Sequence, residues 1–272
     1  MGKISAVYLS WEGVLKGSIG YQGTYFTGSA SRFSSLKYLM YKKRRGLFSG
    51  SPPFKKIDSL QIEALEKGTT DSQIMADVYQ IFNDEIKGMD PQELDKWFAE
   101  YAKKAQKCLD TDILNLARDL HKKGKIVVIG PAPYYRGEID ALLKATGYEN
   151  EFAVIANEWD KGISDRRSIR SIRTDINDAE TRLNFLKTDF KNRTILVVDE
   201  RGALDPVDIV YVGASLDDIQ CMRYIAQNGG KAITSTQSPT EVKVAARKNV
   251  GERLIIQTNF KNFSDTLNQL TD

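Results

Sequence analysis

Short apolar segments rich in β-branched residues alternate along this chain with helical patterns of apolar and polar positions. Most of these segments stop at small or turn-forming residues, as strands buried on both faces of a parallel sheet do. They lie at residues 4–9, 125–129, 153–155, 194–198, 208–212 and 231–233. The segments at 153–155 and 231–233 are the weakest, and we expect them to join the same sheet. The pattern predicts a sheet of mainly parallel strands.

Helical patterns separate several of these strand segments. Residues 112–121 carry apolar side chains at helical spacing, and Gly124 follows them as a C-cap residue does. Further helices are predicted at 138–145 and at 219–228, the second closed by a pair of glycines. Strands that alternate with helices predict a Rossmann-like α/β core with helices on both faces of the sheet.

The stretch between the first and second predicted strands has a different pattern. Serine and glycine are frequent over 17–36, and amphipathic helices are predicted from residue 33, over 71–82 and over 91–105. The last of these begins with an Asp-Pro pair, as N-cap and first helical residue. We therefore predict an α/β core formed by residues 1–15 and 110–272, with a helical cap inserted at 16–109.

The composition excludes some classes of protein but does not indicate a function. The chain has 272 residues, 41% of them hydrophobic and 28% charged, which is ordinary for a globular protein and excludes collagen-like or wholly disordered classes. This length suits about two domains, or one domain with a large insertion. The formal net charge of +3 does not by itself indicate nucleic-acid binding.

Few residues are suited to metal binding or to nucleophilic catalysis. Cys108 and Cys221 lie far apart in the sequence, which excludes a disulfide scaffold and a multi-cysteine zinc site. With His121 as its single histidine, the chain has almost nothing for a Ser-His-Asp mechanism. No apolar run approaches 18 residues and the N-terminus lacks a signal-type segment, so we expect a cytoplasmic protein without membrane contact.

Four segments, in order, resemble the motifs of the haloacid dehalogenase superfamily, most closely its phosphoserine-phosphatase-like branch. VYLSWEGVL at 7–15 occupies the place of an apolar strand followed by Asp-x-Asp-Gly-Thr/Val-Leu, and IVVIGPAP at 126–133 that of a strand ending in Ser or Thr. FAVIANEWDKG at 152–162 resembles the segment that follows, and YVGASLDD at 211–218 resembles Gly-Asp-Ser-x-x-Asp. The resemblance implies a Rossmann-like core with an inserted helical cap.

The resemblance also implies a phosphatase mechanism, and several of its key positions are altered here. In that family the first Asp attacks phosphorus and the second acts as general acid and base, but this chain has Ser10 and Glu12 there. The hydroxyl that would hold a phosphate oxygen falls at Gly130, and the Asp that helps to hold Mg²⁺ falls at Ala214. The third-motif lysine falls near Ala179.

The remaining acidic residues lead to a prediction of lost catalysis. Of the fourth-motif carboxylates only Asp217 and Asp218 remain, too few for a cation that needs six oxygen ligands. Lys187, two turns after the expected third-motif position, is a poor substitute for its lysine. We therefore expect a catalytically inactive pseudophosphatase, without a cofactor, that acts as a binding or regulatory module. An alternative is an atypical Mg²⁺-dependent phosphomonoester hydrolase that uses Glu12 and Asp218.

Cationic and aromatic side chains outside the motif positions are candidate ligand-binding residues. Tyr134, Tyr135 and Arg136 follow the second-motif strand, at the mouth of the expected cleft. Two basic clusters are candidates for binding phosphates of RNA or nucleotides, or an acidic partner. They contain Lys42, Lys43, Arg44, Arg45, Arg166, Arg167, Arg170 and Arg173. The expected partner is an unidentified protein or a small phosphorylated ligand, and a second alternative is an RNA- or ribosome-associated basic protein.

Overall fold

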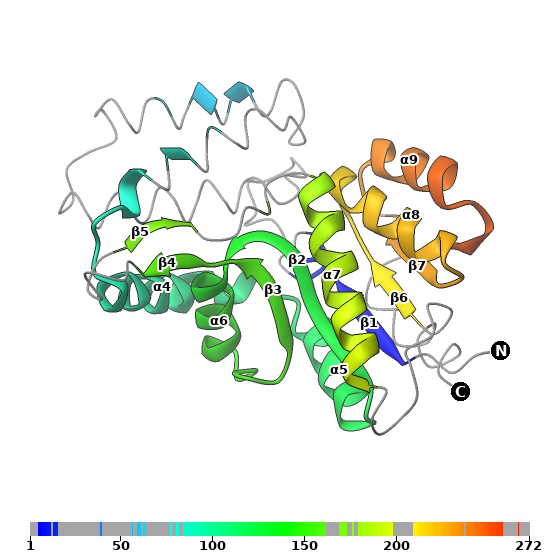
Figure 1. Ribbon diagram of the computed structural model, residues 1–272, viewed down its shortest axis with the longest axis horizontal. Helices are drawn as coiled ribbons and strands as arrows, with labels where there is room; N and C mark the ends of the chain where they lie inside the picture. Colours follow the sequence, from blue (N-terminus) through cyan, green and yellow to red (C-terminus); the bar gives the residue numbers. More distant parts are fainter. Residues whose placement is uncertain are drawn as a thin grey trace.

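A computed structural model gives the architecture of the chain (Figure 1). The structure describes residues 5–11, 13–15, 84–161, 169–172, 179–197, 209–236 and 238–257, with single positions or pairs at 39, 56, 59–60, 62–63, 77, 80–81, 176 and 266. Glu12 and most of the predicted cap lie outside them.

The described residues form a six-stranded sheet in the order β3-β2-β1-β6-β7-β8, in which all neighbours are parallel. Its strands are β1 (Ala6–Leu9), β2 (Ile126–Tyr135), β3 (Ala153–Asn157), β6 (Ile209–Val212), β7 (Lys231–Ser235) and β8 (Leu254–Gln257). Counted along the chain, these six strands have the order 3-2-1-4-5-6 of Rossmann-like folds. A separate antiparallel pair joins β4 (Trp159–Lys161) to β5 (Ile169–Ile172). The predicted α/β class is confirmed.

The strand predicted at 194–198 is wrong, because the backbone of α7 (Ala179–Val197) continues as a helix through Val197. An apolar run of this length is compatible with a buried strand or with part of a helix, so its pattern alone does not distinguish the two. The place beside β1 in the sheet belongs to β6.

Helices cover both faces of the sheet, as predicted (Figure 1). Besides α7, these helices are α5 (Thr111–Lys122), α6 (Arg136–Ala145), α8 (Ile219–Gln227) and α9 (Thr240–Val250). Val7 and Leu9 of β1 are buried against α5 and α6, whereas Ala6 and Tyr8 are buried on the other face with α7, α8 and α9. None of the described helices is long and apolar enough to span a bilayer.

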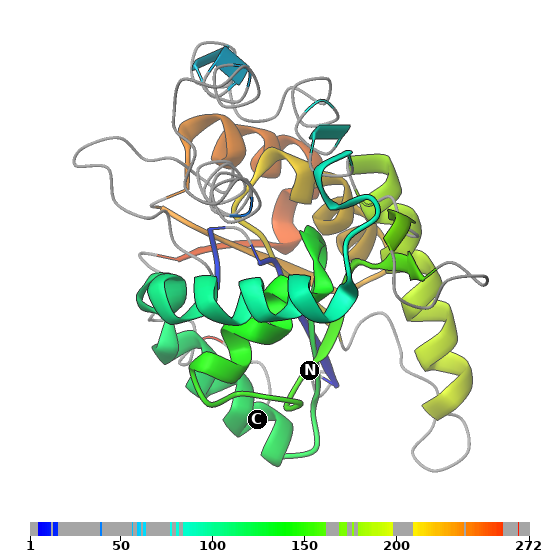
Figure 2. The same ribbon diagram turned by 90° about the vertical axis from the view of Figure 1, so that its left-hand side faces the viewer.

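Helix α4 (Pro91–Ala105) belongs to the segment predicted as the cap, and it packs beside α6 of the core (Figure 2). Asp90 caps its first turn and Pro91 is its first residue, as the sequence predicts. Tyr101, Ala102 and Ala105 are buried in the same apolar cluster as α5, α6 and the sheet. The end of the predicted insertion is therefore attached to the core, while the division at residues 16 and 109 stays a prediction.

The N-cap of α5 offers a test of this local structure. The Asp110 carboxylate accepts hydrogen bonds from the backbone N–H groups of Asp112 (3.1 Å) and Ile113 (3.2 Å). Replacing Asp110 with alanine is expected to lower the free energy of unfolding by about 1 kcal/mol, because these donors lose their acceptor. Asp110→Asn keeps a side-chain oxygen and is the matched control in urea denaturation. Equal losses for the two variants would show that the cap contributes nothing.

Candidate functional site

The first, second and fourth motif segments meet at the carboxyl edge of the sheet. Leu9 at the end of β1 is paired in register with Ile129 of β2 on one side and Val212 of β6 on the other. The chain therefore passes from these three neighbouring positions into Ser10, Gly130 and Gly213. In open α/β sheets, ligands bind outside the carboxyl ends of the strands. We call this region the strand-end site.

Ser10 is almost completely buried in this site, with 1% of its surface exposed. Its backbone N–H donates to the Val212 carbonyl oxygen at 2.9 Å, so the residue continues the pairing of β1 with β6. The indole of Trp11, the next residue, is fully buried in the core below. A nucleophile must be reached by its substrate, and the side chain of Ser10 is enclosed by its surroundings.

Gly130 stands where the superfamily has a phosphate-binding hydroxyl, and the backbone here excludes any side chain. Its φ is +114°, a value that L-residues with a Cβ rarely adopt. A Cβ at this position would lie 2.3 Å from the Ile155 carbonyl oxygen of the neighbouring strand. The serine or threonine of the family pattern therefore has no room in this backbone.

The loops that follow β1 and β6 are in close contact. Gly13 has φ +72°, and a Cβ there would lie 2.8 Å from the Cβ of Ala214. Within the second of these loops, a Cβ on Gly213 would lie 2.7 Å from the Cβ of Asp218. The glycine at 13 allows the two loops to approach, which brings the altered metal position, Ala214, against the first-motif loop, while the glycine at 213 leaves room for Asp218.

The Asp218 carboxylate is fully buried and is surrounded by hydrogen-bond donors. Its Oδ2 accepts from the backbone N–H groups of Ala214 (3.0 Å) and Ser215 (2.9 Å) and from the Ser215 hydroxyl (2.8 Å). Its Oδ1 accepts from the Tyr211 hydroxyl at 3.0 Å and from Nη1 of Arg182 at 3.4 Å. A carboxylate offers about four lone-pair positions. Five donors therefore occupy its whole acceptor capacity.

Arg182 of α7 supplies the positive charge of this cluster. Its side chain is fully buried, and its guanidinium lies 3.2 Å from Asp217 Oδ2 and 3.4 Å from Asp218 Oδ1. Leu186, four residues further along the helix, is also fully buried. Arg182 thus lies on the side of α7 that faces the protein interior, and one guanidinium is shared by two carboxylates.

Sequence reasoning missed Arg182. It placed the third-motif position near Ala179, where no side-chain cation is present, with Lys187 as a substitute. The ammonium of Lys187 lies instead over the Tyr224 ring, 5.4 Å from its centre. The available signal was helical spacing, because Arg182 precedes Leu186 by four residues on what the structure shows to be the buried stripe of α7.

The described residues do not fit the Mg²⁺ ion that the superfamily resemblance implies. Ala214 has no side-chain oxygen, the oxygens of Asp218 are occupied by donors, and Asp217 is paired with Arg182. The buried guanidinium also repels a second cation. Within the described part of the chain, no three His, Cys, Asp or Glu side chains are grouped closely enough to hold a metal ion.

Two weakly acidic side chains beside Asp218, those of Tyr211 and Cys221, have raised pKa values. Burial, and then the nearby Asp218 carboxylate, raise the pKa of the Tyr211 hydroxyl well above its ordinary value. The same two causes, burial first, raise the pKa of the Cys221 thiol to about 12. Both groups therefore stay protonated at neutral pH, and Tyr211 remains a hydrogen-bond donor to Asp218.

The Cys221 thiol is expected to resist alkylation by iodoacetamide at pH 8, because the thiolate is the reactive form. Cys108 is partly exposed and is expected to react first, as mass spectrometry of the labelled peptides will show. Rapid labelling of Cys221 in the native chain would contradict its burial.

The raised pKa of Cys221 also predicts how stability depends on pH. The thiol ionises near pH 9.0 in the unfolded chain and near 12 in the folded one, so the free energy of unfolding is expected to fall as pH rises between these values.

The structure describes only some of the other predicted ligand-binding residues. Tyr135 is buried at the end of β2, while Arg136 begins α6 and pairs with Asp140 (3.5 Å) and Glu158 (3.3 Å). The side chain of Tyr134 is not among those described. Of the basic clusters, the structure describes only the backbone of Arg170, in β5, while the 42–45 cluster and the remaining arginines lie outside the described residues.

Strand order and the meeting of the motif segments identify the fold of this protein. Strand order, parallel pairing and the convergence of the motif positions at one edge are those expected from the resemblance. Comparison with solved structures confirms it, and the chain has the haloacid dehalogenase fold. No protein-family model and no curated protein matches the chain.

Three solved structures show the similarity. A protein of unknown function from Bordetella pertussis Tohama I is 15% identical, with a TM-score of 0.60, and the match covers 93% of this chain and 99% of that one. A phosphoserine phosphohydrolase-like protein from Francisella tularensis subsp. tularensis SCHU S4 is 12% identical, with a TM-score of 0.55 and coverage of 97% and 99%. Cytosolic 5′-nucleotidase IIIB bound to cytidine is 12% identical, with a TM-score of 0.55 and coverage of 98% and 85%. These identities establish the fold alone.

Proposed function

We propose that this chain is a catalytically inactive protein with the haloacid dehalogenase fold, a pseudophosphatase that acts as a binding or regulatory module. The observation that carries the proposal is the state of Asp218, whose two oxygens are occupied by five donors. The carboxylate holds together the loop in which the superfamily binds its metal, and it has no acceptor position left for a cation.

The residues beside Asp218 support the same conclusion. The superfamily mechanism needs an anionic nucleophile and a cation that stabilises charge in the transition state. Ser10 is uncharged and enclosed, and Ala214 supplies no metal ligand. Arg182 has the right charge, but Asp217 and Asp218 neutralise it. Loss of nucleophile and metal together removes both the covalent step and the main electrostatic stabilisation.

The atypical hydrolase is the less favoured function. It requires Asp218 to act together with Glu12, and Asp218 would first have to release at least one of its buried donors, which is costly. The RNA-associated alternative depends on basic clusters outside the described residues and stays a prediction. The proposed module has no cofactor, is cytoplasmic, and has a protein or a small phosphorylated ligand as its partner.

Phosphatase assays on the purified chain test the proposal. The wild type is expected to show no Mg²⁺-dependent turnover of an aryl phosphate or of a panel of small phosphomonoesters. Millimolar Mg²⁺ is also expected to leave its Tm unchanged, because an ion that does not bind the native state does not stabilise it.

Substitutions at the motif positions test which residues account for the absence, or the presence, of phosphatase activity. Ser10→Asp, Glu12→Asp and Ala214→Asp together restore the family's carboxylates, and a gain of Mg²⁺ binding by this variant would show that the substitutions caused the loss. Gly130 is left unchanged because its backbone admits no side chain. Turnover by the wild type that EDTA or Glu12→Gln abolishes would overturn the proposal in favour of the hydrolase.

A further inference from the structure

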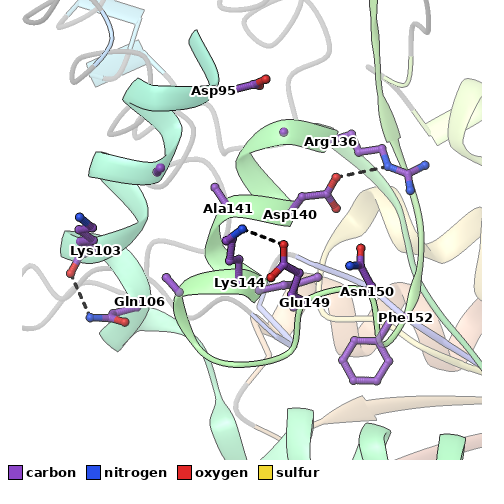
Figure 3. Close-up of a pocket in the computed structure, with 14 residues that line it drawn as sticks. Asp95, Lys103, Gln106, Arg136, Asp140, Ala141, Lys144, Glu149, Asn150 and Phe152 are labelled. Atoms are coloured by element: carbon purple, nitrogen blue, oxygen red, sulfur yellow. Dashed lines mark hydrogen bonds and ion pairs between the residues drawn. The ribbon is translucent and has the colours of Figure 1, made fainter. Parts of the chain in front are cut away.

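Exposed charged side chains around α6 are paired within the molecule. Arg136 lies 3.5 Å from Asp140, and Lys144 lies 2.9 Å from Glu149 (Figure 3). The outer side of α9 differs, because its exposed charges form no ion pair with any described residue. These charges are therefore available to another molecule.

Two of the exposed charges of α9 belong to a stripe of four residues, which we call the α9 stripe. The stripe has the i, i+3, i+4 and i+7 spacing of one helix face and consists of Glu241, Val244, Ala245 and Lys248. Val244 is 57% exposed, and it is one of two large apolar side chains among the described residues that are exposed. The side of α9 that faces the protein interior consists of the buried residues Val242, Ala246 and Val250.

A second copy of the chain fits this stripe when the two α9 helices run antiparallel. Glu241 and Lys248 lie at equal distances, about 5 Å along the helix, on either side of the point between Val244 and Ala245. A two-fold axis at that point places Glu241 of each copy opposite Lys248 of the other and brings the apolar side chains of both copies together. We propose that the chain forms a symmetric dimer through the α9 stripe, with two Glu241–Lys248 ion pairs between the copies.

The chemistry of the stripe favours a second copy over a polyanion. It carries one acid and one base with apolar residues between them, so it is complementary to itself in the reverse direction. A nucleic acid would be repelled by Glu241, and α9 has no aromatic residue on which a base could stack. Stable interfaces bury about 1,200–2,000 Å², more than one pair of short helices provides. The dimer is therefore expected to dissociate on dilution.

Sedimentation equilibrium of the full chain tests the proposal. The average mass is expected to rise from one chain toward two as the concentration is raised from about 10 µM to about 1 mM. Because salt screens exposed ion pairs, association is expected to weaken when NaCl is raised to about 0.5 M.

Charge reversals locate the interface. Lys248→Glu places carboxylates opposite each other, Glu241→Lys places ammonium groups opposite each other, and each is expected to weaken the dimer about tenfold. The double variant reverses both charges and is expected to restore association. Both reversals oppose the dipole of α9, so the double variant is the least stable of the three and its restored dimer cannot come from better folding.

Two further variants complete the series. Val244→Asp places like charges at the two-fold axis and is expected to leave the chain monomeric. Lys122→Glu is the matched control, because it makes the same charge reversal at an exposed position of α5, on the other face of the sheet, and it is expected to associate like the wild type. Circular dichroism melts confirm that each variant is folded.

Three results would overturn the proposal. One is a folded wild type that stays monomeric throughout the concentration range, and its binding of polyglutamate or of an RNA oligonucleotide would assign the α9 stripe to another partner. The second is a dimer that neither single reversal weakens. The third is a folded double variant that associates no better than the single ones. None of these results depends on whether the strand-end site is catalytic.

Discussion

Replacing Arg182 with methionine is expected to lower the free energy of unfolding by about 3–5 kcal/mol, the usual cost of removing one partner of a buried ion pair. The substitution leaves Asp218 fully buried without its cation and frees Asp217 from the same guanidinium. Urea denaturation followed by circular dichroism measures the loss. The loop at 214–218 is expected to lose hydrogen-exchange protection in the same variant, because Asp218 holds it together.

Two further variants separate charge from packing at this position. Arg182→Lys keeps a cation near the carboxylates and is expected to cost less than Arg182→Met, although a single ammonium does not reproduce the contacts of a guanidinium. Lys191→Met, at an exposed position of the same helix, is the control and is expected to change stability by less than about 0.5 kcal/mol. If Arg182→Met behaved like this control, the buried pair would be energetically unimportant.

Replacing Gly130 with alanine is expected to lower the free energy of unfolding by about 3 kcal/mol or more. The backbone at φ +114° disfavours a residue with a Cβ, and the added carbon lies 2.3 Å from the Ile155 carbonyl oxygen, so β2 and β3 must move apart. Thermal and urea denaturation give the magnitude. Amide exchange in β3 is expected to accelerate with it.

Gly147→Ala is the matched control for this prediction. Gly147 also has a positive φ, +84°, but a Cβ there meets nothing within 4 Å. Its expected cost, about 1 kcal/mol, comes from the backbone conformation alone. The difference between the two variants measures the close approach of β2 to β3 at Gly130, and equal losses would contradict it.

The helices and strands were predicted well where the apolar pattern was clear and a capping or turn-forming residue marked the end of the element. β1, β2 and β6 are buried on both faces and therefore appear as uninterrupted apolar runs. The helix from Thr111 to Lys122 has both an apolar stripe and a cap. The segment 194–198 failed because its apolar run is equally compatible with a helix. α9 and β8 were missed: Val242, Ala246 and Val250 have helical spacing, but no strong N-cap precedes them.

The strand-end site was predictable by position but not by chemistry. The motif pattern placed Ser10, Gly130 and Ala214 at adjoining strand ends, and the sheet pairs those strands. The occupied state of Asp218 was not predictable, because one of its donors, Arg182, lies 36 residues earlier in the sequence, on a helix. The steric exclusion at Gly130 depends likewise on the Ile155 carbonyl of another strand.

The central position of β1 has a consequence for how the chain assembles. Its two neighbours in the sheet, β2 and β6, lie about 120 and 200 residues further along the chain. At about 5–20 residues per second, a ribosome needs roughly 10–40 s after making β1 before it completes β6. During that interval an apolar strand has an unpaired edge in the nascent chain, which makes it a site for misassociation and for chaperone binding.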